Sequence, residues 1–185
     1  DIATSADGAM DSYVADLNGD GYLDILTASM HDNTIAWYEN NKDRNPSFTT
    51  KHTISTSADS ANGIFAADLD GDGDLDIISA SANDDKIAWY ENSYAYFTER
   101  EISLGADGAS KVFAADLDGD GDLDIVSSSR GDDTIAWYEN DGAADPTFTA
   151  ADIATNADVL SLSATPIPRS LSMSLSGIRD LSLIL

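Results

Sequence analysis

Three short segments of this sequence carry oxygen-bearing side chains at every second position, a spacing suited to holding a metal ion. Each segment has Asp or Asn at positions 1, 3 and 5 and Asp at position 9, and position 7 can contribute its backbone carbonyl oxygen. The predicted ligands are Asp16, Asn18, Asp20, Tyr22 and Asp24 in loop 1, Asp68, Asp70, Asp72, Asp74 and Asp76 in loop 2, and Asp116, Asp118, Asp120, Asp122 and Asp124 in loop 3.

The chemistry of these ligands predicts Ca²⁺. Calcium is a hard cation that takes about 6–8 oxygen ligands, whereas zinc and copper favour imidazole or thiolate groups. The loops contain neither group, and the whole chain has 0 cysteines. Magnesium is disfavoured because it retains its waters in preference to an all-protein cage. We therefore expect three calcium sites, of which loop 1 is the weakest because Asn18 replaces an aspartate.

Glycines at positions 4 and 6 of each loop are expected to adopt positive φ, so that the backbone can curl around the ion. The leucine at position 8 is expected to point into the core. Position 12 holds Thr27, Ser79 or Ser127 in place of the glutamate that closes an EF-hand site. The aspartate at position 9 is therefore the expected closing ligand. Metal-free hairpins also use Asp-Gly turns, but three loops with ligands in the same register favour metal.

The loops belong to a longer internal repeat. IFAADLDGDGDLDIISAS from Ile64 returns as VFAADLDGDGDLDIVSSS from Val112, and YVADLNGDGYLDILTAS from Tyr13 is an earlier copy. Each copy is followed by IAWYEN, which begins at residues 35, 87 and 135. The loops begin at Asp16, Asp68 and Asp116, which are 52 and 48 residues apart. The repeating unit is therefore about fifty residues long.

Each unit has the pattern of four short strands. In the second unit these are 65–67, 75–80, 87–91 and 97–102, with a polar turn at 83–85. Strands at regular spacing indicate an all-β protein, and four strands per unit of this length predict a propeller blade. We expect three four-stranded antiparallel blades over residues 1–158. Propellers close with about 4–8 blades, so this is a partial propeller, to be completed by blades of a longer parent chain, by self-association or by the C-terminal tail.

Residues 159–185 depart from the repeat and alternate Leu or Met with Ser. A period of two suits half-buried strands. The segment is therefore either a degenerate blade or a terminus foreign to the native repeat.

The acidic composition narrows the choice of partners. Against 34 Asp and Glu stand 9 Lys and Arg, for a net charge of −25. Such a surface repels nucleic acid and anionic lipid, and it destabilises the folded chain unless cations neutralise it. The chain also lacks an apolar run of the roughly 18 residues that a membrane span needs. We expect neither nucleic-acid binding nor membrane insertion.

The AADLDGDGDLDI and IAWYEN blocks resemble the FG-GAP/VCBS repeat of integrin α-subunit propellers and related lectin-like propellers. The resemblance covers about residues 1–158. It implies a seven-bladed ring in which the calcium loop joins the first two strands of each blade and calcium is mainly structural. This chain has three such units, so a ligand site that spans several blades does not follow from the resemblance.

Other residues with chemical potential favour a structural role. Trp37, Trp89 and Trp137 recur once per unit and are expected to pack between blades because they bury much area, although exposed aromatics would stack on sugars. The Arg130–Asp132 tripeptide Arg-Gly-Asp can recruit integrins in other proteins, but ordinary turn variation explains it here. His31 lies in a turn, and aligning the units by sequence places His52 opposite Glu101 and Asp152. Neither histidine has a catalytic partner at the required spacing, and we expect no enzyme activity.

Taken together, these patterns predict a non-enzymatic calcium-binding module for adhesion or ligand binding, with a protein or glycan as partner. The alternative is an accessory propeller of a secreted carbohydrate-active enzyme or a lectin. A purely structural spacer is the third possibility. Loose calcium sites of extracellular proteins bind at about 0.1–1 mM, so we expect an extracellular or cell-surface location.

Overall fold

The computed structural model describes residues 2–4 and 6–154, and the Leu/Ser-rich segment 159–185 lies outside them. The described chain is all-β, as the sequence predicts. Its twelve strands form three four-stranded antiparallel sheets. The sheets consist of β1 (Ala9–Ala15), β2 (Asp24–Ser29), β3 (Thr34–Glu39) and β4 (Thr50–Ser55) in blade 1, β5 (Ala61–Ala67), β6 (Asp76–Ser81), β7 (Lys86–Ser93) and β8 (Tyr96–Ser103) in blade 2, and β9 (Ala109–Ala115), β10 (Asp124–Ser129), β11 (Thr134–Asn140) and β12 (Phe148–Ala154) in blade 3.

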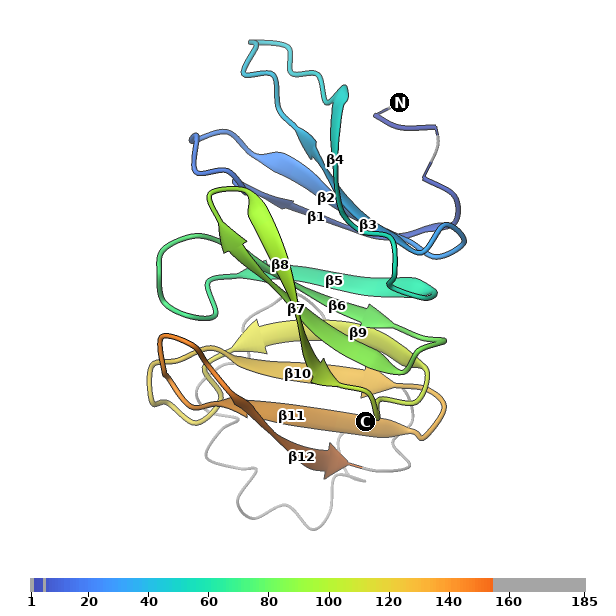
Figure 1. The fold of residues 1–185 in the computed structure, drawn as a ribbon, viewed down its shortest axis with the longest axis vertical. Helices are drawn as coiled ribbons and strands as arrows, with labels where there is room; N and C mark the ends of the chain where they lie inside the picture. The colour runs from blue at the N-terminus through green and yellow to red at the C-terminus, as the bar shows by residue number, and fades with distance from the viewer. Residues whose placement is uncertain (1, 5, 155–185) are drawn as a thin grey trace, which may run out of the picture.

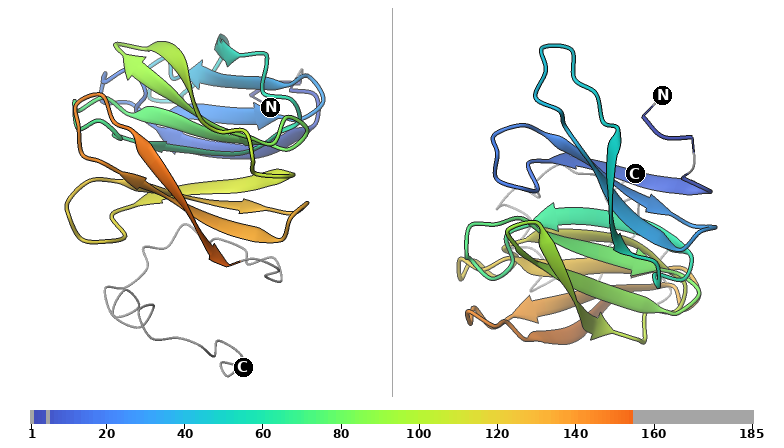
Figure 2. Two further views of the ribbon diagram at one scale, coloured as in Figure 1. Left: turned by 60° about the horizontal axis from the view of Figure 1, so that its bottom comes forward. Right: turned by 45° about the horizontal axis from the view of Figure 1, so that its top comes forward.

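Each blade is a meander in which consecutive strands pair, so its strand order follows the chain. The blades lie one after another as separate layers, and the three sheets do not close on one another (Figures 1 and 2). The described part of the chain contains no helix that could cross a membrane. The predicted blade architecture is therefore confirmed for this part of the chain.

The hydrophobic core lies between blades: blade 2 buries one face of its sheet against blade 1 and the other against blade 3. In β7, Ile87 and Trp89 belong to the cluster shared with blade 3, whereas the alternate residues Ala88 and Tyr90 belong to the cluster shared with blade 1. This follows from the two-residue period of a strand, which sends successive side chains to opposite faces. Gly63 on β5 lies so close to β9 that an added Cβ would come within 2.7 Å of the Ser110 carbonyl oxygen.

The tryptophans occupy these interfaces. Trp37 and Trp89 are almost fully buried, which confirms the packing role predicted for them, while Trp137 in blade 3 is half-buried.

The strand pairing corrects one sequence alignment. His52 pairs with Trp37, and the residues that pair with Trp89 and Trp137 are Arg100 and Ala151, not Glu101 and Asp152. In each unit the paired residue stands two positions before an isoleucine (Ile54, Ile102 or Ile153), so alignment on that isoleucine gives the observed register. The His52 ring stacks on Trp37 at 4.2 Å, and the Arg100 guanidinium lies 5.1 Å from the Trp89 ring centroid. His52 and Arg100 thus cover the indole rings of Trp37 and Trp89. Ala151, the equivalent residue in blade 3, is too short to cover Trp137 in the same way.

Candidate metal centre

The three predicted loops connect the first two strands of each blade. Each loop starts directly after β1, β5 or β9 and ends on the first residue of β2, β6 or β10. The blades are stacked with strands in the same order, so all three loops project from one side of the stack, on the left in Figure 1. The fold therefore repeats the same candidate site three times along one edge of the molecule.

The aspartate at position 9 of each loop is buried and links two parts of its blade. In loop 2 one Asp76 oxygen accepts a hydrogen bond from Leu69 N at 3.0 Å, and the other accepts from Asn92 N at 2.8 Å. Asp24 and Asp124 make the equivalent pairs of bonds at 2.9–3.2 Å. Each carboxylate thus joins the start of its loop to the end of its IAWYEN strand. A carboxylate has about four lone-pair sites, so both oxygens can still bind a cation.

The remaining side chains hold the loop in a tight curl. The side-chain oxygen at position 3 accepts from the backbone N–H at position 5, as in Asp72 N to Asp70 Oδ1 at 3.1 Å. The aspartate at position 1 accepts from the glycine at position 6 in loops 1 and 2, at 2.7 and 3.1 Å. All six loop glycines have positive φ, between 69° and 108°. The expectation for these glycines is therefore confirmed.

Two loops bring carboxylate oxygens close enough together to share an ion. Oxygens of Asp68, Asp70 and Asp76 in loop 2 lie within 4.8 Å of one another. In loop 3 the corresponding group is Asp116, Asp118 and Asp120. These groups contain positions 1, 3 and 9 in one loop and positions 1, 3 and 5 in the other, all of which belong to the predicted ligand set.

Loop 2 fits a cation by a further criterion. Asp68 Oδ1 is buried and has no hydrogen-bond partner among the described residues. A buried oxygen without a partner costs about 1–3 kcal/mol, and more if it is charged. A cation bound between Asp68, Asp70 and Asp76 would remove this cost, so the residues of loop 2 fit a divalent ion that prefers oxygen.

The electrostatics of loop 2 point the same way. Burial raises the pKa of Asp76 to about 7, and the nearby charge of Asp70 adds to the effect. Burial also raises the pKa of Asp70, with contributions from the charges of Asp72 and Asp68. These carboxylates crowd one another in a partly dry site, and a bound cation would hold them in the ionised form.

Loop 1 differs from the other two in a way the sequence analysis missed. Lys42, from the β3–β4 loop, places its ammonium 2.9 Å from Asp20 Oδ2. Burial alone would raise the pKa of Asp20, but hydrogen bonds from Lys42, Tyr22 and Asn18 outweigh it and lower that pKa. Lys42 therefore supplies positive charge where a calcium ion would compete for Asp20. The contact was not predicted because Lys42 lies outside the repeated loop motif in the sequence.

The hydrophobic anchor of the loops is not the predicted one. Leu23 at position 8 is 57% exposed, so the expectation that this leucine points into the core is wrong for loop 1. The equivalents Leu75 and Leu123 are half-buried and pack against the core clusters. The leucine at position 2 is the buried anchor in loops 1 and 2, where Leu17 and Leu69 reach the interface with the next blade. The backbone N–H of this leucine donates a hydrogen bond to the aspartate at position 9, which holds the leucine in place.

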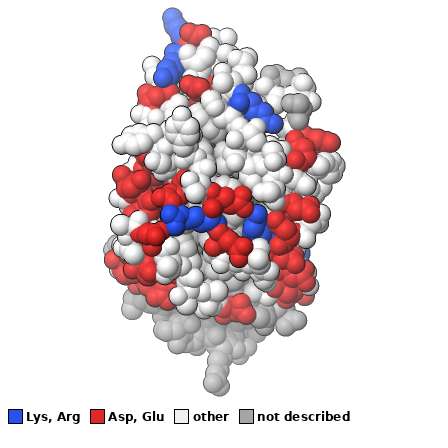
Figure 3. Space-filling view, viewed as in Figure 1, with Lys and Arg blue, Asp and Glu red and all other residues white. Residues whose placement is uncertain are grey.

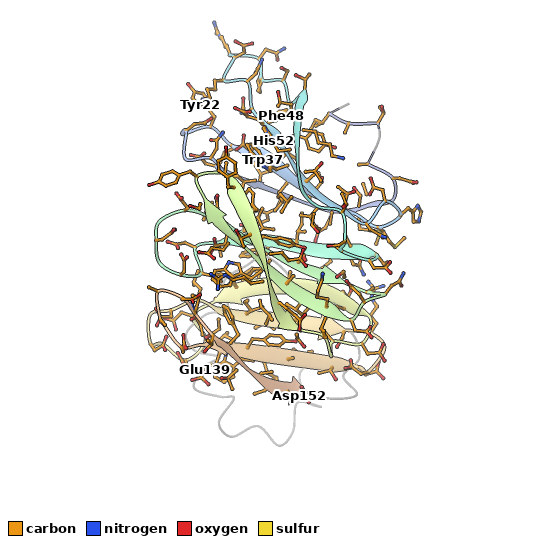
Figure 4. All side chains as sticks on the ribbon, viewed as in Figure 1. Tyr22, Trp37, Phe48, His52, Glu139 and Asp152 are labelled. Atoms are coloured by element: carbon orange, nitrogen blue, oxygen red, sulfur yellow. The ribbon has the colours of Figure 1, made fainter. Side chains whose placement is uncertain are left out.

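The β3–β4 and β10–β11 regions give little support for other chemistry. His52 Nε2 lies 3.1 Å from Glu39 Oε2, and Figure 4 shows its ring beside Trp37. In the Arg-Gly-Asp turn, Asp132 Oδ1 accepts from Thr134 N at 3.2 Å, and Gly131 N donates to the Asp107 carbonyl oxygen at 2.8 Å. These bonds are those of a turn between two strands, in agreement with the structural interpretation of the tripeptide.

Acidic groups far outnumber basic groups among the charged residues, 34 against 9. Figure 3 shows Asp and Glu gathered along both sides of one face, with few Lys and Arg among them. Several of the basic groups pair with carboxylates: Lys86 with Glu99 at 2.7 Å and Lys111 with Asp11 at 2.7 Å. The loops therefore lie in a negative field that attracts cations.

Comparison with known families agrees with the repeat and the loop geometry. The FG-GAP-like repeat model matches three times, over residues 16–79, 68–127 and 116–167. Each match begins at the first aspartate of a loop; the first two continue into the following unit, and the third extends to residue 167. The matches together cover most of the chain, and the chain belongs to the FG-GAP-like repeat family.

A second similarity is short. The chain is 70% identical over 30 residues to a transcription-repair-coupling factor of Staphylococcus haemolyticus (strain JCSC1435). The aligned segment is 16% of this chain and 3% of that protein. The chain therefore spans only a small fraction of that relative, and the match carries no inference about function.

Proposed function

We propose that this chain is a calcium-stabilised FG-GAP propeller module whose loops bind Ca²⁺ at three structural sites. The observation that carries the proposal is the loop 2 site, in which a buried aspartate, an unpartnered buried oxygen and a third carboxylate converge. Calcium would be bound by the side chains at positions 1, 3, 5 and 9 and the carbonyl oxygen at position 7. It would neutralise the clustered charge and fix the hairpin between the first two strands of each blade.

The energetic contribution of calcium follows from its affinity. Loose extracellular sites bind at about 0.1–1 mM, and a calcium concentration tenfold above such a constant stabilises the fold by about 1.4 kcal/mol per site. This is a substantial part of a typical stability of about 5–15 kcal/mol. Affinities in this range are useful only where calcium is plentiful, so we propose an extracellular or cell-surface setting. Full occupancy at submicromolar free calcium would contradict that location.

The proposed role is non-enzymatic: the rigid loops present a surface for adhesion, with a protein or glycan as ligand. The alternative, an accessory propeller of a secreted carbohydrate-active enzyme or a lectin, is favoured by exposed aromatic groups. Tyr94 lies in the β7–β8 turn and Tyr96 begins β8, and they are 86% and 80% exposed. Tyrosine rings at such positions can stack on sugars. A glycan array distinguishes the adhesion module from the lectin. Glycan binding that is lost in Tyr94→Ala and Tyr96→Ala supports the lectin.

Equilibrium dialysis against calcium tests the proposed ion directly. The wild-type chain is expected to bind three ions, and the double variant Asp72→Ala/Asp120→Ala is expected to bind one. Leu104→Ala serves as the matched control, since the exposed Leu104 follows β8 at the end of blade 2 opposite loop 2, and it should still bind three. Binding of no calcium by the folded wild-type chain, checked by circular dichroism, would refute the proposal.

A further inference from the structure

The two ends of the three-blade stack present the two halves of one repeated interface. We define the trailing face of a blade as the residues that pack on the following blade, and the leading face as those that pack on the preceding one. Between blades 1 and 2 the buried cluster joins a trailing face (Ala15, Leu17, Leu26, Ala28, Ile35, Trp37) to a leading face (Ala58, Ala61, Ile64, Ala66, Ile77, Ala88, Tyr90).

The interface between blades 2 and 3 uses the same positions of the repeat. Its trailing face is Ala67, Leu69, Ile78, Ala80, Ile87 and Trp89, and its leading face is Ala106, Ala109, Val112, Ala114, Ile125, Ala136 and Tyr138. Each residue has a counterpart at the equivalent place in the first interface. The packing rule is therefore a property of the blade, repeated at each junction.

Blade 1 retains an apolar leading face. The equivalent residues are Ala6, Ala9, Ser12, Val14, Ile25, Ala36 and Tyr38. Val14 is 54% exposed, whereas its counterparts Ala66 and Ala114 are 5% and 7% exposed. Met10, next to this face on β1, is 42% exposed, and its counterparts Asn62 and Ser110 are buried. Ser12 is the one polar replacement. Ala36 and Tyr38 are buried within the chain, so this surface is built like a blade junction and is open around Val14 and Met10.

Blade 3 carries the complementary trailing face. The equivalent residues are Ala115, Leu117, Val126, Ser128, Ile135 and Trp137. Leu117 and Trp137 are half-buried, whereas the same leucine and tryptophan in blades 1 and 2 are nearly fully buried. Val126, Ser128 and Ile135 of this face are buried, so its exposed part lies around Leu117 and Trp137. This face therefore keeps the leucine and tryptophan that anchor the two internal junctions.

A side-chain hydrogen bond crosses both internal junctions at the same position. Asn92 Nδ2 donates to the Leu17 carbonyl oxygen at 3.0 Å, and Asn140 Nδ2 donates to the Leu69 carbonyl oxygen at 2.9 Å. In blade 1 the equivalent amide, Asn40 Nδ2, donates to Leu23 O within its own blade and to no other acceptor among the described residues. The equivalent acceptor in blade 3 is the carbonyl oxygen of Leu117.

The β2–β3-type turns supply a second polar link. Ser60 N donates to Asn33 Oδ1, and Gly108 N donates to Asp85 Oδ1, each at 2.9 Å. The counterparts at the two ends are Gly8 N in blade 1 and Asp133 in blade 3. Asp133 adopts φ 54°, the same turn conformation as Asn33 (56°) and Asp85 (54°). The acceptor turn of blade 3 thus has the conformation used at both internal junctions.

From this complementarity we propose that two copies of the chain associate head to tail, with the leading face of blade 1 of each copy packed on the trailing face of blade 3 of the other. Such a heterologous contact either closes a ring or extends a fibre. Two copies of three blades give six blades, which is within the range of about 4–8 at which propellers close. The occupant is a second copy because its end face repeats the contacts already made inside the chain. This inference does not depend on the identity of the ion in the loops.

Sedimentation equilibrium of the 185-residue chain tests the proposal. The net charge of −25 opposes association, so the runs should be made in calcium and, separately, in chelator with high salt that screens the charge. The expected mass is twice the 19.5 kDa of the chain. Val14→Arg should raise the dimer dissociation constant by at least about tenfold, because it places a charge in the junction. Tyr96→Arg, which adds the same charge at an exposed position of β8, should leave the constant unchanged.

Val14 is exposed within one copy, so its substitution is compatible with the folded chain, and circular dichroism on the same samples checks this. Met10→Arg, at the neighbouring exposed position, provides an independent second variant with the same expected effect. A chain that stays at 19.5 kDa in both solutions overturns the proposal. So does a dimer insensitive to both Val14→Arg and Met10→Arg, and so do masses larger than a dimer, which would mean an open fibre.

Discussion

Asp72→Ala in loop 2 is expected to destabilise the chain only when calcium is present. Asp72 is exposed, and its Oδ1 accepts a single hydrogen bond, from Asp74 N at 2.8 Å within the same turn. Surface substitutions of this kind usually change the free energy of unfolding by less than about 0.5 kcal/mol. In chelator the variant should therefore unfold like the wild type. The loss of one exposed hydrogen bond is offset by the removal of one negative charge from a crowded acidic loop.

In calcium the same variant loses a ligand and, with it, the stabilisation from one site. At tenfold saturation this loss is about 1.4 kcal/mol. For a chain of this size, 1 kcal/mol shifts the melting temperature by about 2–4 °C, so Tm should fall by about 3–6 °C. The assay is thermal unfolding followed by circular dichroism, in chelator and in calcium, with Leu104→Ala, at the opposite end of blade 2, as the control that changes neither curve. An equal fall of Tm in chelator and calcium would refute the assignment of Asp72 as a ligand.

Four further variants separate the structural parts of the site and the fold. Asp76→Ala, unlike Asp72→Ala, should cost at least about 2 kcal/mol in chelator as well, because it leaves two buried backbone N–H groups without acceptors; urea unfolding in chelator measures this, and an unchanged midpoint would contradict it. Lys42→Ala should tighten calcium binding at loop 1, since it removes the cation beside a predicted ligand; equilibrium dialysis would reveal weaker or unchanged binding if this is wrong. Gly63→Ala should cost about 1–3 kcal/mol by overpacking β5 against the Ser110 carbonyl oxygen 2.7 Å from the new Cβ; a neutral urea midpoint would show that the strands move apart at no cost. His31→Ala, at an exposed turn position, should stay within about 0.5 kcal/mol of wild type in the same assay; a larger loss would give its contact with Asp7 a structural role not expected from the exposure of the pair.

The sequence was sufficient to predict the blade, because the signals that define it are local. The Asp-Gly turn, the two-residue alternation of IAWYEN and the fifty-residue period each depend on neighbours along the chain. The strands β5 to β8 lie where the second unit predicts them; β5, β7 and β8 are longer than predicted, and β6 is shifted by one residue. The positive φ of the loop glycines was likewise predictable, since the curl of a short loop requires it.

The features that were missed depend on contacts between distant segments. Lys42 approaches Asp20 because of the path of the β3–β4 loop, and Asn92 reaches the Leu17 carbonyl oxygen in the preceding blade, 75 residues away. The exposure of Leu23 also follows from tertiary structure: in loop 1 the core is filled from position 2, so position 8 is left outside. The register of His52, in contrast, was available from the sequence, since alignment on Ile54, Ile102 and Ile153 places it level with Arg100 and Ala151, as the strand pairing does.

The most direct test of the calcium proposal is the melting temperature of the wild-type chain across a calcium series that starts in chelator, with magnesium as the parallel control. The proposal predicts that Tm rises with calcium at submillimolar to millimolar concentrations and changes little with magnesium. A Tm that stays constant in calcium, in a sample that unfolds cooperatively from a β-rich state, would mean that the three loops are turns that need no ion.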